Sequence, residues 1–270
     1  MFRGFCLWIV AGMAAAWADG NRIEDPALEE AVRSQIFAKR GNREALVDTE
    51  LAQVSTVVAR GRGIRSLAGL EKCRNLSMLD VAGNSISDLS PLSGLTRLQY
   101  LDGRSNRVAD PRPLAGVTSL QYLHLGDNAL EDVTALAGLN QLTALYLTGN
   151  RVTSLGPLLG LTRLTSLYVD DNRIESLEGI GRLTALSSLS LSGNRVADLR
   201  PLTGLRGLQH LFVERNRLRD LSALKAWLES DREMAFAPYV QVRCGGNPLG
   251  SEARRRQIPA LREAGYRIAY

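Results

Sequence analysis

Apolar residues recur along this chain with a period of 22 residues, and one asparagine closes each period. The pattern is Leu-x-x-Leu-x-Leu-x-x-Asn, as in Leu142, Leu145, Leu147 and Asn150. The seven asparagines that follow this spacing are Asn84, Asn106, Asn128, Asn150, Asn172, Asn194 and Asn216. Seven occurrences at one fixed spacing indicate a repeat protein, in which each repeat forms one coil of a solenoid.

Within each repeat, the pattern predicts one short strand followed by a turn. If the first leucine is position 1, positions 4 and 6 alternate with positions 5 and 7, which is the period of a β-strand. Positions 1, 4, 6, 11, 14, 17 and 20 are apolar almost throughout and should face the interior. The asparagine at position 9 is polar, so we expect its amide to satisfy backbone groups where the chain leaves the strand. This is the leucine-rich repeat signature.

A second motif, Asp-Leu-x-Pro-Leu, follows the asparagine, as in residues 88–92 and 198–202. Aspartate caps a short helical turn and proline suits its opening, so the motif predicts 3-10 turns instead of long helices. The expected fold class is an α/β leucine-rich repeat solenoid. It has a parallel concave β-sheet, mostly 3-10 turns on the convex side, a helical N-terminal cap and an α/β C-terminal cap.

The two ends of the repeat region carry sequence typical of caps. Residues 19–53 are assigned to a helical N-terminal cap, in which Asp25-Pro26 opens an amphipathic helix and Thr49 starts a second short one. The leucine-rich repeats span residues 54–229, and a true helix is expected in place of the last 3-10 turn.

Residues 230–270 are assigned to an irregular repeat and a C-terminal cap. Asn216 and Asn247 are 31 residues apart, nine more than one period, so this coil carries an insertion. A helix over residues 251–264 and a final strand over 266–270 are expected to cover the last coil.

Residues 1–18 have the layout of a secretory signal peptide. Arg3 supplies the positive charge, residues 4–16 are uncharged and mostly apolar, and Ala16-Trp17-Ala18 gives a small-residue cleavage signature. The apolar run is too short to span a bilayer. We therefore expect an exported, periplasmic or secreted protein that is not inserted in a membrane after cleavage.

Three motifs together resemble bacterial internalin-type leucine-rich repeat proteins. They are the 22-residue repeats with Asp-Leu-x-Pro-Leu, the cap Ile23-x-Asp25-Pro26-x-Leu28, and the terminal Asn247-Pro248-Leu249. The resemblance covers roughly residues 23–270. It implies that the chain recognises a protein on its concave face, and it does not name that protein.

The outward strand positions 3, 5 and 7 should line the concave face, and they hold four of the seven tyrosines and both histidines. Aromatic neighbours can simply stabilise a sheet, by about 0.2–1 kcal/mol per pair. Tyrosine is also a preferred anchor of protein interfaces, so we predict a partner-binding surface. Its residues are Tyr100, Asp102, Arg104, Tyr122, His124, Tyr146, Tyr168, Asp170, Asp171, His210 and Phe212.

The second repeat departs from the pattern, because Gly103 replaces the inward residue at position 6 and Pro111 replaces a leucine. Glycine inside a strand can mark a bulge or a close backbone approach. The alternative is a degenerate repeat that the other repeats tolerate.

Arginine recurs at position 10, just after the asparagine. These residues, which we call the arginine strip, are Arg107, Arg151, Arg173, Arg195 and Arg217. One interpretation is a solvated row partly neutralised by the aspartates at position 13. The alternative is a track for an anionic polymer such as an envelope glycan, which would bind with a steep salt dependence.

The composition disfavours chemistry and nucleic-acid binding. Three Cys and two His leave little for a metal site, and the net charge is only +5. Cys73 and Cys244 lie eight coils apart, about 38 Å at the strand spacing, and a disulfide needs Cα atoms within about 7 Å. The chain contains no nucleophile elbow, phosphate loop or HExxH motif, so we expect no enzyme activity and no cofactor.

Overall fold

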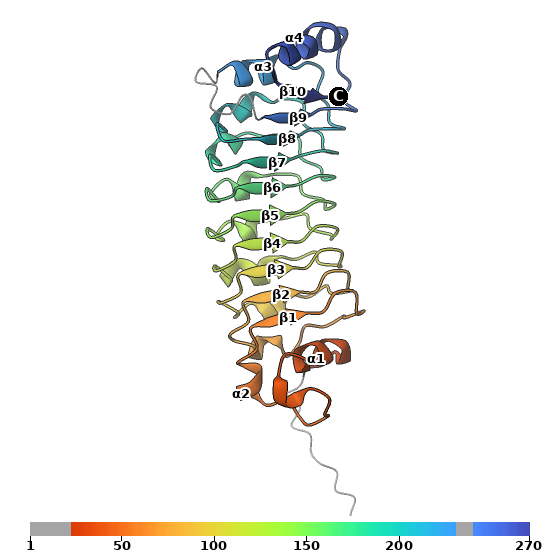
Figure 1. Ribbon diagram of the computed structural model, residues 1–270, viewed down its shortest axis with the longest axis vertical. Coiled ribbons are helices and arrows are strands. Elements are labelled where there is room, and N and C mark those ends of the chain that lie inside the picture. Colours follow the sequence, from red (N-terminus) through yellow and green to blue (C-terminus); the bar gives the residue numbers. More distant parts are fainter. Residues whose placement is uncertain (1–22, 231–239) are drawn as a thin grey trace, which may run out of the picture.

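The computed structural model describes residues 23–230 and 240–270 of the chain. The predicted signal peptide, residues 1–18, lies outside these described residues. Ten parallel strands form a single open sheet in chain order, stacked along the long axis of the molecule (Figure 1). The strands are β1 Thr56–Val58, β2 Met78–Asp80, β3 Tyr100–Asp102, β4 Tyr122–His124, β5 Ala144–Tyr146, β6 Ser166–Tyr168, β7 Ser188–Ser190, β8 His210–Phe212, β9 Gln241–Arg243 and β10 Arg267–Ala269.

The predicted 3-10 turns occupy the side of each coil opposite the sheet. They are η2 Leu70–Lys72, η3 Ser90–Leu92, η4 Arg112–Gly116, η5 Thr134–Leu136, η6 Gly156–Leu158, η7 Ile180–Arg182 and η8 Arg200–Gly204. Asp88 shows the predicted cap, because its Oδ1 accepts the backbone N–H of Ser90 at 2.8 Å. In the last regular coil the turn is replaced by a true helix, α3 (Ser222–Glu229), as the sequence predicts.

Helices close both ends of the stack. The N-terminal cap holds α1 (Pro26–Arg33), η1 (Phe37–Lys39) and α2 (Asp48–Leu51), so the second α-helix begins one residue before the predicted Thr49. The C-terminal cap holds a π-helical segment, η10 (Ala253–Gln257), followed by α4 (Ile258–Glu263) and β10. One predicted helix over 251–264 is thus divided into two kinds of helical turn.

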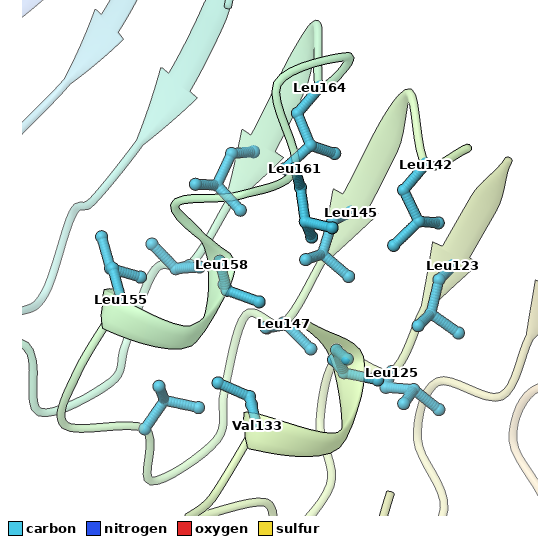
Figure 2. Close-up of a cluster of buried hydrophobic side chains, with 14 of the residues drawn as sticks. Leu123, Leu125, Val133, Leu142, Leu145, Leu147, Leu155, Leu158, Leu161 and Leu164 are labelled. Carbon is cyan, nitrogen blue, oxygen red and sulfur yellow. The ribbon is translucent and has the colours of Figure 1, made fainter. Parts of the chain in front are cut away.

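Inward leucines from successive repeats form one continuous core. Leu145 and Leu147 of one coil lie close to Leu123 and Leu125 of the preceding coil, and all four are completely buried (Figure 2). No coil could bury these side chains alone, because each strand has only three residues and one inward face. The core therefore exists only as a stack.

The repeated asparagines satisfy backbone groups inside the turns, as predicted. The Nδ2 of Asn150 donates to the carbonyls of Leu147 at 2.9 Å and of Leu125, in the preceding coil, at 2.8 Å. Its Oδ1 accepts the backbone N–H of Leu130 at 2.9 Å. Each asparagine thus joins two coils as well as closing its own turn.

The repeat that contains Gly103 forms a regular strand. Around Gly103 the strand pairing keeps its register, and the Cδ2 of Leu125 lies 3.1 Å from where a Cβ of Gly103 would be. A neighbouring leucine therefore occupies the space, and the strand has no bulge at this place.

Cys73 and Cys244 are buried and unpaired, which confirms the prediction made from their separation.

Candidate functional site

Four tyrosines and one histidine form a continuous stack across β3 to β6, which we call the tyrosine stack. The rings of Tyr100 and Tyr122 are parallel within 7°, with centroids 4.3 Å apart. The stack continues from Tyr122 to Tyr146 at 5.3 Å and from Tyr146 to Tyr168 at 4.9 Å. Strand register explains two of these contacts, because Tyr100 pairs with Tyr122 and Tyr146 pairs with Tyr168 one strand spacing apart. The contact between Tyr122 and Tyr146 is diagonal, with the rings tilted by 40°.

His124 completes the stack as a neutral ring. Its centroid lies 5.0 Å from that of Tyr146, with the planes 21° apart. Burial lowers the pKa of His124, and this effect outweighs the opposite effect of the nearby Asp102 carboxylate. Its Nδ1 accepts the backbone N–H of Gly126 at 3.1 Å, which requires an unprotonated nitrogen. A Cβ on Gly126 would lie 2.8 Å from the Cε1 of His124, so this glycine makes room for the ring.

Two of the tyrosine hydroxyls are held in their neutral form. Burial raises the pKa of both Tyr122 and Tyr146, and neighbouring tyrosines add to the effect. The four rings are half-buried, so each combines a packed ring with a polar hydroxyl. This combination suits an interface anchor, which needs an apolar body and a polar tip.

An ion-pair cluster lies beside the stack, toward the N-terminal end of the sheet. Asp80 and Asp102 are adjacent in register, and each is only 1% exposed. The guanidinium of Arg60 contacts Asp80 and lies 3.7 Å from Asp102, and the Nε of Arg104 lies 3.6 Å from the same carboxylate. Asp102 was predicted to belong to the partner-binding surface, but it is buried and pairs with these arginines. A partner would meet Arg60 and Arg104 instead.

The predicted residues near the C-terminal end are not part of the tyrosine stack. His210 and Phe212 lie on β8, with their ring centroids 6.3 Å apart. β7, which lies between β6 and β8, carries Ser188 and Ser190 at its outward positions and no aromatic residue. The structure thus brings the predicted aromatic residues together as two groups, separated by one strand of small side chains.

Asp170 and Asp171 are held in different ways. The Oδ1 of Asp170 accepts the hydroxyl of Ser190 at 2.5 Å and the backbone N–H of Ser192 at 2.7 Å. Asp171 is exposed and pairs with Arg215 at 3.0 Å. The backbone of Asp171 is left-handed (φ 49°), and the same repeat position is left-handed at Asp127 (φ 53°). These left-handed turns place the carboxylates of Asp127 and Asp171 at the edge of the concave face.

A cation–π contact that the sequence analysis missed lies beside the second aromatic group. The guanidinium carbon of Arg243 is 5.3 Å from the centroid of Phe212. The two residues pair across β8 and β9, but the nine-residue insertion hides their common register in the sequence. Aligning Asn247 with Asn216, instead of counting 22 residues, finds this pair, because Arg243 and Phe212 each lie four residues before their asparagine.

The arginine strip is exposed along its whole length, and its neutralising residues differ from those predicted. Arg151 pairs with Glu131 at 3.4 Å, and both Arg195 and Arg217 share Glu175, at 3.3 and 3.9 Å. The position-13 aspartates were predicted to neutralise the strip, but they cap the 3-10 turns instead. The strip members Arg107 and Arg173 form no ion pair within residues 23–230 and 240–270.

The concave face is an open surface without the features of a small-molecule site. Hollows of about 310–580 Å³ lie along the 3-10 turns on the convex side, and no residue of the predicted concave site lines them. The described part of the chain holds no group of three or more His, Cys, Asp or Glu that could bind a metal ion. An open surface of this kind suits a macromolecular partner.

Family models match the repeat region of the chain. The model described as leucine-rich repeats in two copies matches residues 140–182 and 184–226, and a second leucine-rich repeat model matches residues 105–152. A comparison with curated protein sequences gives no significant match.

Solved structures of bacterial repeat proteins are similar over most of the chain. Internalin InlF from Listeria monocytogenes is 26% identical, with a TM-score of 0.76, over 84% of this chain and 71% of that one. A leucine-rich repeat protein from Leptospira interrogans is 20% identical, with a TM-score of 0.68, over 82% and 62% of the two chains, and shows the same fold.

Internalin C2 from Listeria monocytogenes is 33% identical to this chain. The match has a TM-score of 0.71 and covers 74% of this chain and 88% of internalin C2. The open parallel sheet, the 3-10 turns and this identity together place the chain in the internalin-type leucine-rich repeat family.

Proposed function

We propose that this chain is an exported, non-catalytic scaffold that recognises a protein partner on its concave face. Leucine-rich repeat proteins are generally protein-binding scaffolds, and internalin-like members are generally non-catalytic. The signal-peptide layout of residues 1–18 supports export. None of the helices in the described residues is both long and apolar enough to cross a membrane.

The tyrosine stack is the observation that carries the proposal. A soluble protein gains little from presenting five adjacent rings at its surface, whereas tyrosine is enriched among the residues that dominate binding energy. The ion-pair cluster of Arg60, Asp80, Asp102 and Arg104 adds charged groups in fixed positions next to the rings. Fixed polar groups around an apolar centre are the usual arrangement of a specific interface.

We expect the double variant Tyr122→Ala, Tyr146→Ala to reduce partner affinity by about 1000-fold, since two anchor residues each contribute about 2 kcal/mol or more at typical interfaces and every 1.4 kcal/mol is tenfold. Thermal stability should fall by only a few degrees, because a cross-strand ring pair contributes about 0.2–1 kcal/mol. The measurement is affinity capture from the periplasm or culture medium with mass spectrometry, followed by a binding assay on the captured protein.

The matched control is Phe37→Ala, which removes an aromatic ring that is 84% exposed on the N-terminal cap, away from the sheet. This control should capture the partner as the wild type does. Full capture by the double tyrosine variant would refute the concave-face proposal.

A second candidate function is binding of an anionic polymer, such as an envelope glycan, along the arginine strip. Its support is the excess of positive charge, because Glu131 and Glu175 are the only carboxylates of the described residues that pair with the five arginines. The arginines recur at regular intervals, about 4.8 Å from one coil to the next, and this regularity suits a polymer of repeating units.

The triple charge reversal Arg151→Glu, Arg173→Glu, Arg195→Glu tests this candidate. If the strip is the site, retention on purified anionic envelope polysaccharide should be lost, and raised salt should have the same effect on the wild type. The control reverses the same number of charges at Arg254, Arg255 and Arg256 in the C-terminal cap. Equal loss in both variants would indicate an effect of net charge and would exclude a track on the strip.

A further inference from the structure

Small side chains on β7 separate the rings of β6 from those of β8, so we expect a notch in the outward surface at this place. Tyr168, Ser190 and Phe212 are aligned in register across these three strands. The rings of Tyr146 and Tyr168 stack at 4.9 Å, which is about one strand spacing. Between Tyr146 and Phe212, this row of residues lacks a ring only at Ser190. We call this place the serine notch. Its floor consists of Ser190 and Ser192.

The walls of the serine notch combine aromatic rings with carboxylates. Two residues further along the chain, Asp170 and Glu214 flank Ser192 in the same way that Tyr168 and Phe212 flank Ser190. Asp170 is held in place by its hydrogen bonds to Ser190 and Ser192. Glu214 forms no ion pair within the described residues. The notch therefore carries two negative charges, and neither is neutralised by a neighbouring cation.

The floor of the notch contains a polar group without a partner. Ser192 is 7% exposed, and its hydroxyl makes no hydrogen bond to any described residue, although its backbone N–H donates to Asp170. Since this hydroxyl is not fully enclosed, solvent can satisfy it in the free chain, and a ligand would replace that solvent. Ser192 occupies an outward position between the two carboxylates. A ligand that donates a hydrogen bond there would satisfy it.

The dimensions of the notch suit a planar cation. Tyr168 and Phe212 are two strands apart, which is about 9.6 Å, so a group midway between them lies about 4.8 Å from each ring. A guanidinium within about 6 Å of a ring centroid is attracted by the ring face. Arg243 already occupies such a position against Phe212, at 5.3 Å, so this ring binds a guanidinium within the chain itself.

We propose that the serine notch binds an arginine side chain of the protein partner. The guanidinium lies between Tyr168 and Phe212 and donates hydrogen bonds to Asp170, Glu214 and the hydroxyl of Ser192. Arginine fits better than lysine, because its planar fork can stack on rings and bind two carboxylates at the same time. The inference rests on the proposed function, since it assigns one residue type of the partner to one place on the concave face.

The direct test uses a defined probe. N-acetyl-arginine amide is titrated into the isotope-labelled chain, and N-acetyl-citrulline amide serves as the neutral control of the same shape. NMR chemical-shift changes for the arginine probe should concentrate on Ser190, Ser192 and Phe212 and should weaken with salt. The citrulline probe should bind at least about tenfold more weakly, because it lacks the charge-assisted hydrogen bonds.

Ser190→Ala removes the hydroxyl that donates to Asp170 without filling the notch, so it should keep the localised shifts. Ser190→Tyr also removes this hydroxyl, but it places a ring in the notch and keeps both carboxylates. It should abolish the localised shifts, whereas Thr56→Tyr, which adds the same ring on β1, should leave them intact. Shifts of equal size with citrulline, shifts spread over all surface carboxylates, or undiminished shifts in Ser190→Tyr would each overturn the proposal.

The same probe separates this proposal from the proposed function. The double variant Tyr122→Ala, Tyr146→Ala keeps the serine notch, so it should bind the arginine probe like the wild type even while it loses the partner. If the probe does not bind the wild type but the double variant loses the partner, the notch proposal fails and the proposed function stands. If the probe binds at the notch but the double variant keeps the partner, the notch proposal stands and the tyrosine stack is not the main binding surface.

Discussion

Asn150→Ala is expected to lower the free energy of unfolding by about 3–4 kcal/mol, near the upper end for a single substitution. The variant leaves the N–H of Leu130 and the carbonyls of Leu125 and Leu147 without their partner amide in a buried turn. Each buried group that loses its partner costs about 1–3 kcal/mol, and part of this cost is relieved by local movement. Chemical denaturation measures the loss as a lower midpoint.

The control for this prediction is Asn140→Ala, an exposed asparagine ten residues earlier in the chain. It should change stability by less than about 0.5 kcal/mol. A similarly small effect at Asn150 would mean that the repeated amides are not needed to hold neighbouring coils together.

Gly204→Ala is expected to lower the free energy of unfolding by about 2–3 kcal/mol, because the added methyl group clashes with the backbone of the neighbouring coil on the convex side. A Cβ at Gly204 would contact the carbonyl oxygen of Gly181 and lie 2.8 Å from its Cα. These atoms belong to η7 and η8, and backbone atoms cannot rotate away as a side chain can. The two coils must therefore separate to admit one methyl group, and thermal or chemical unfolding should reveal the loss.

Gly160→Ala is the matched control, because Gly160 holds the same repeat position as Gly204 two coils earlier and has no neighbouring atom within 4 Å of a Cβ. This substitution should be neutral or stabilise by about 0.5 kcal/mol, through the reduced freedom of the unfolded chain. If both variants were equally stable, the contact between η7 and η8 would be looser than the structure indicates.

The fold was predictable because one physical requirement recurs at one spacing. Every coil needs an apolar inner face and an amide such as that of Asn150 at its turn, and the 22-residue period reveals both. The sequence also predicted which face carries the tyrosines, since outward and inward positions alternate along a strand. The partner-binding role of these residues stays a prediction.

Contacts between coils were predicted less well, because they depend on which residues meet at the surface. The burial of Asp102 depends on Arg60, which lies 42 residues earlier in the irregular first coil. The pairing of Arg195 with Glu175 depends on side-chain length, since the shorter aspartates at position 13 cap their own turns. A repeat pattern gives the position of each residue, but it does not give the direction in which a long side chain reaches.

The strand of serines between the two aromatic groups has a consequence for the size of the partner. Tyr100 on β3 and Phe212 on β8 are five strand spacings apart, which is about 24 Å. A flexible loop of a few residues could cover either aromatic group, but not both. A partner that covers the whole tyrosine stack and also reaches Phe212 therefore needs a rigid footprint of about 24 Å across the strands, which is comparable to the width of a small folded domain.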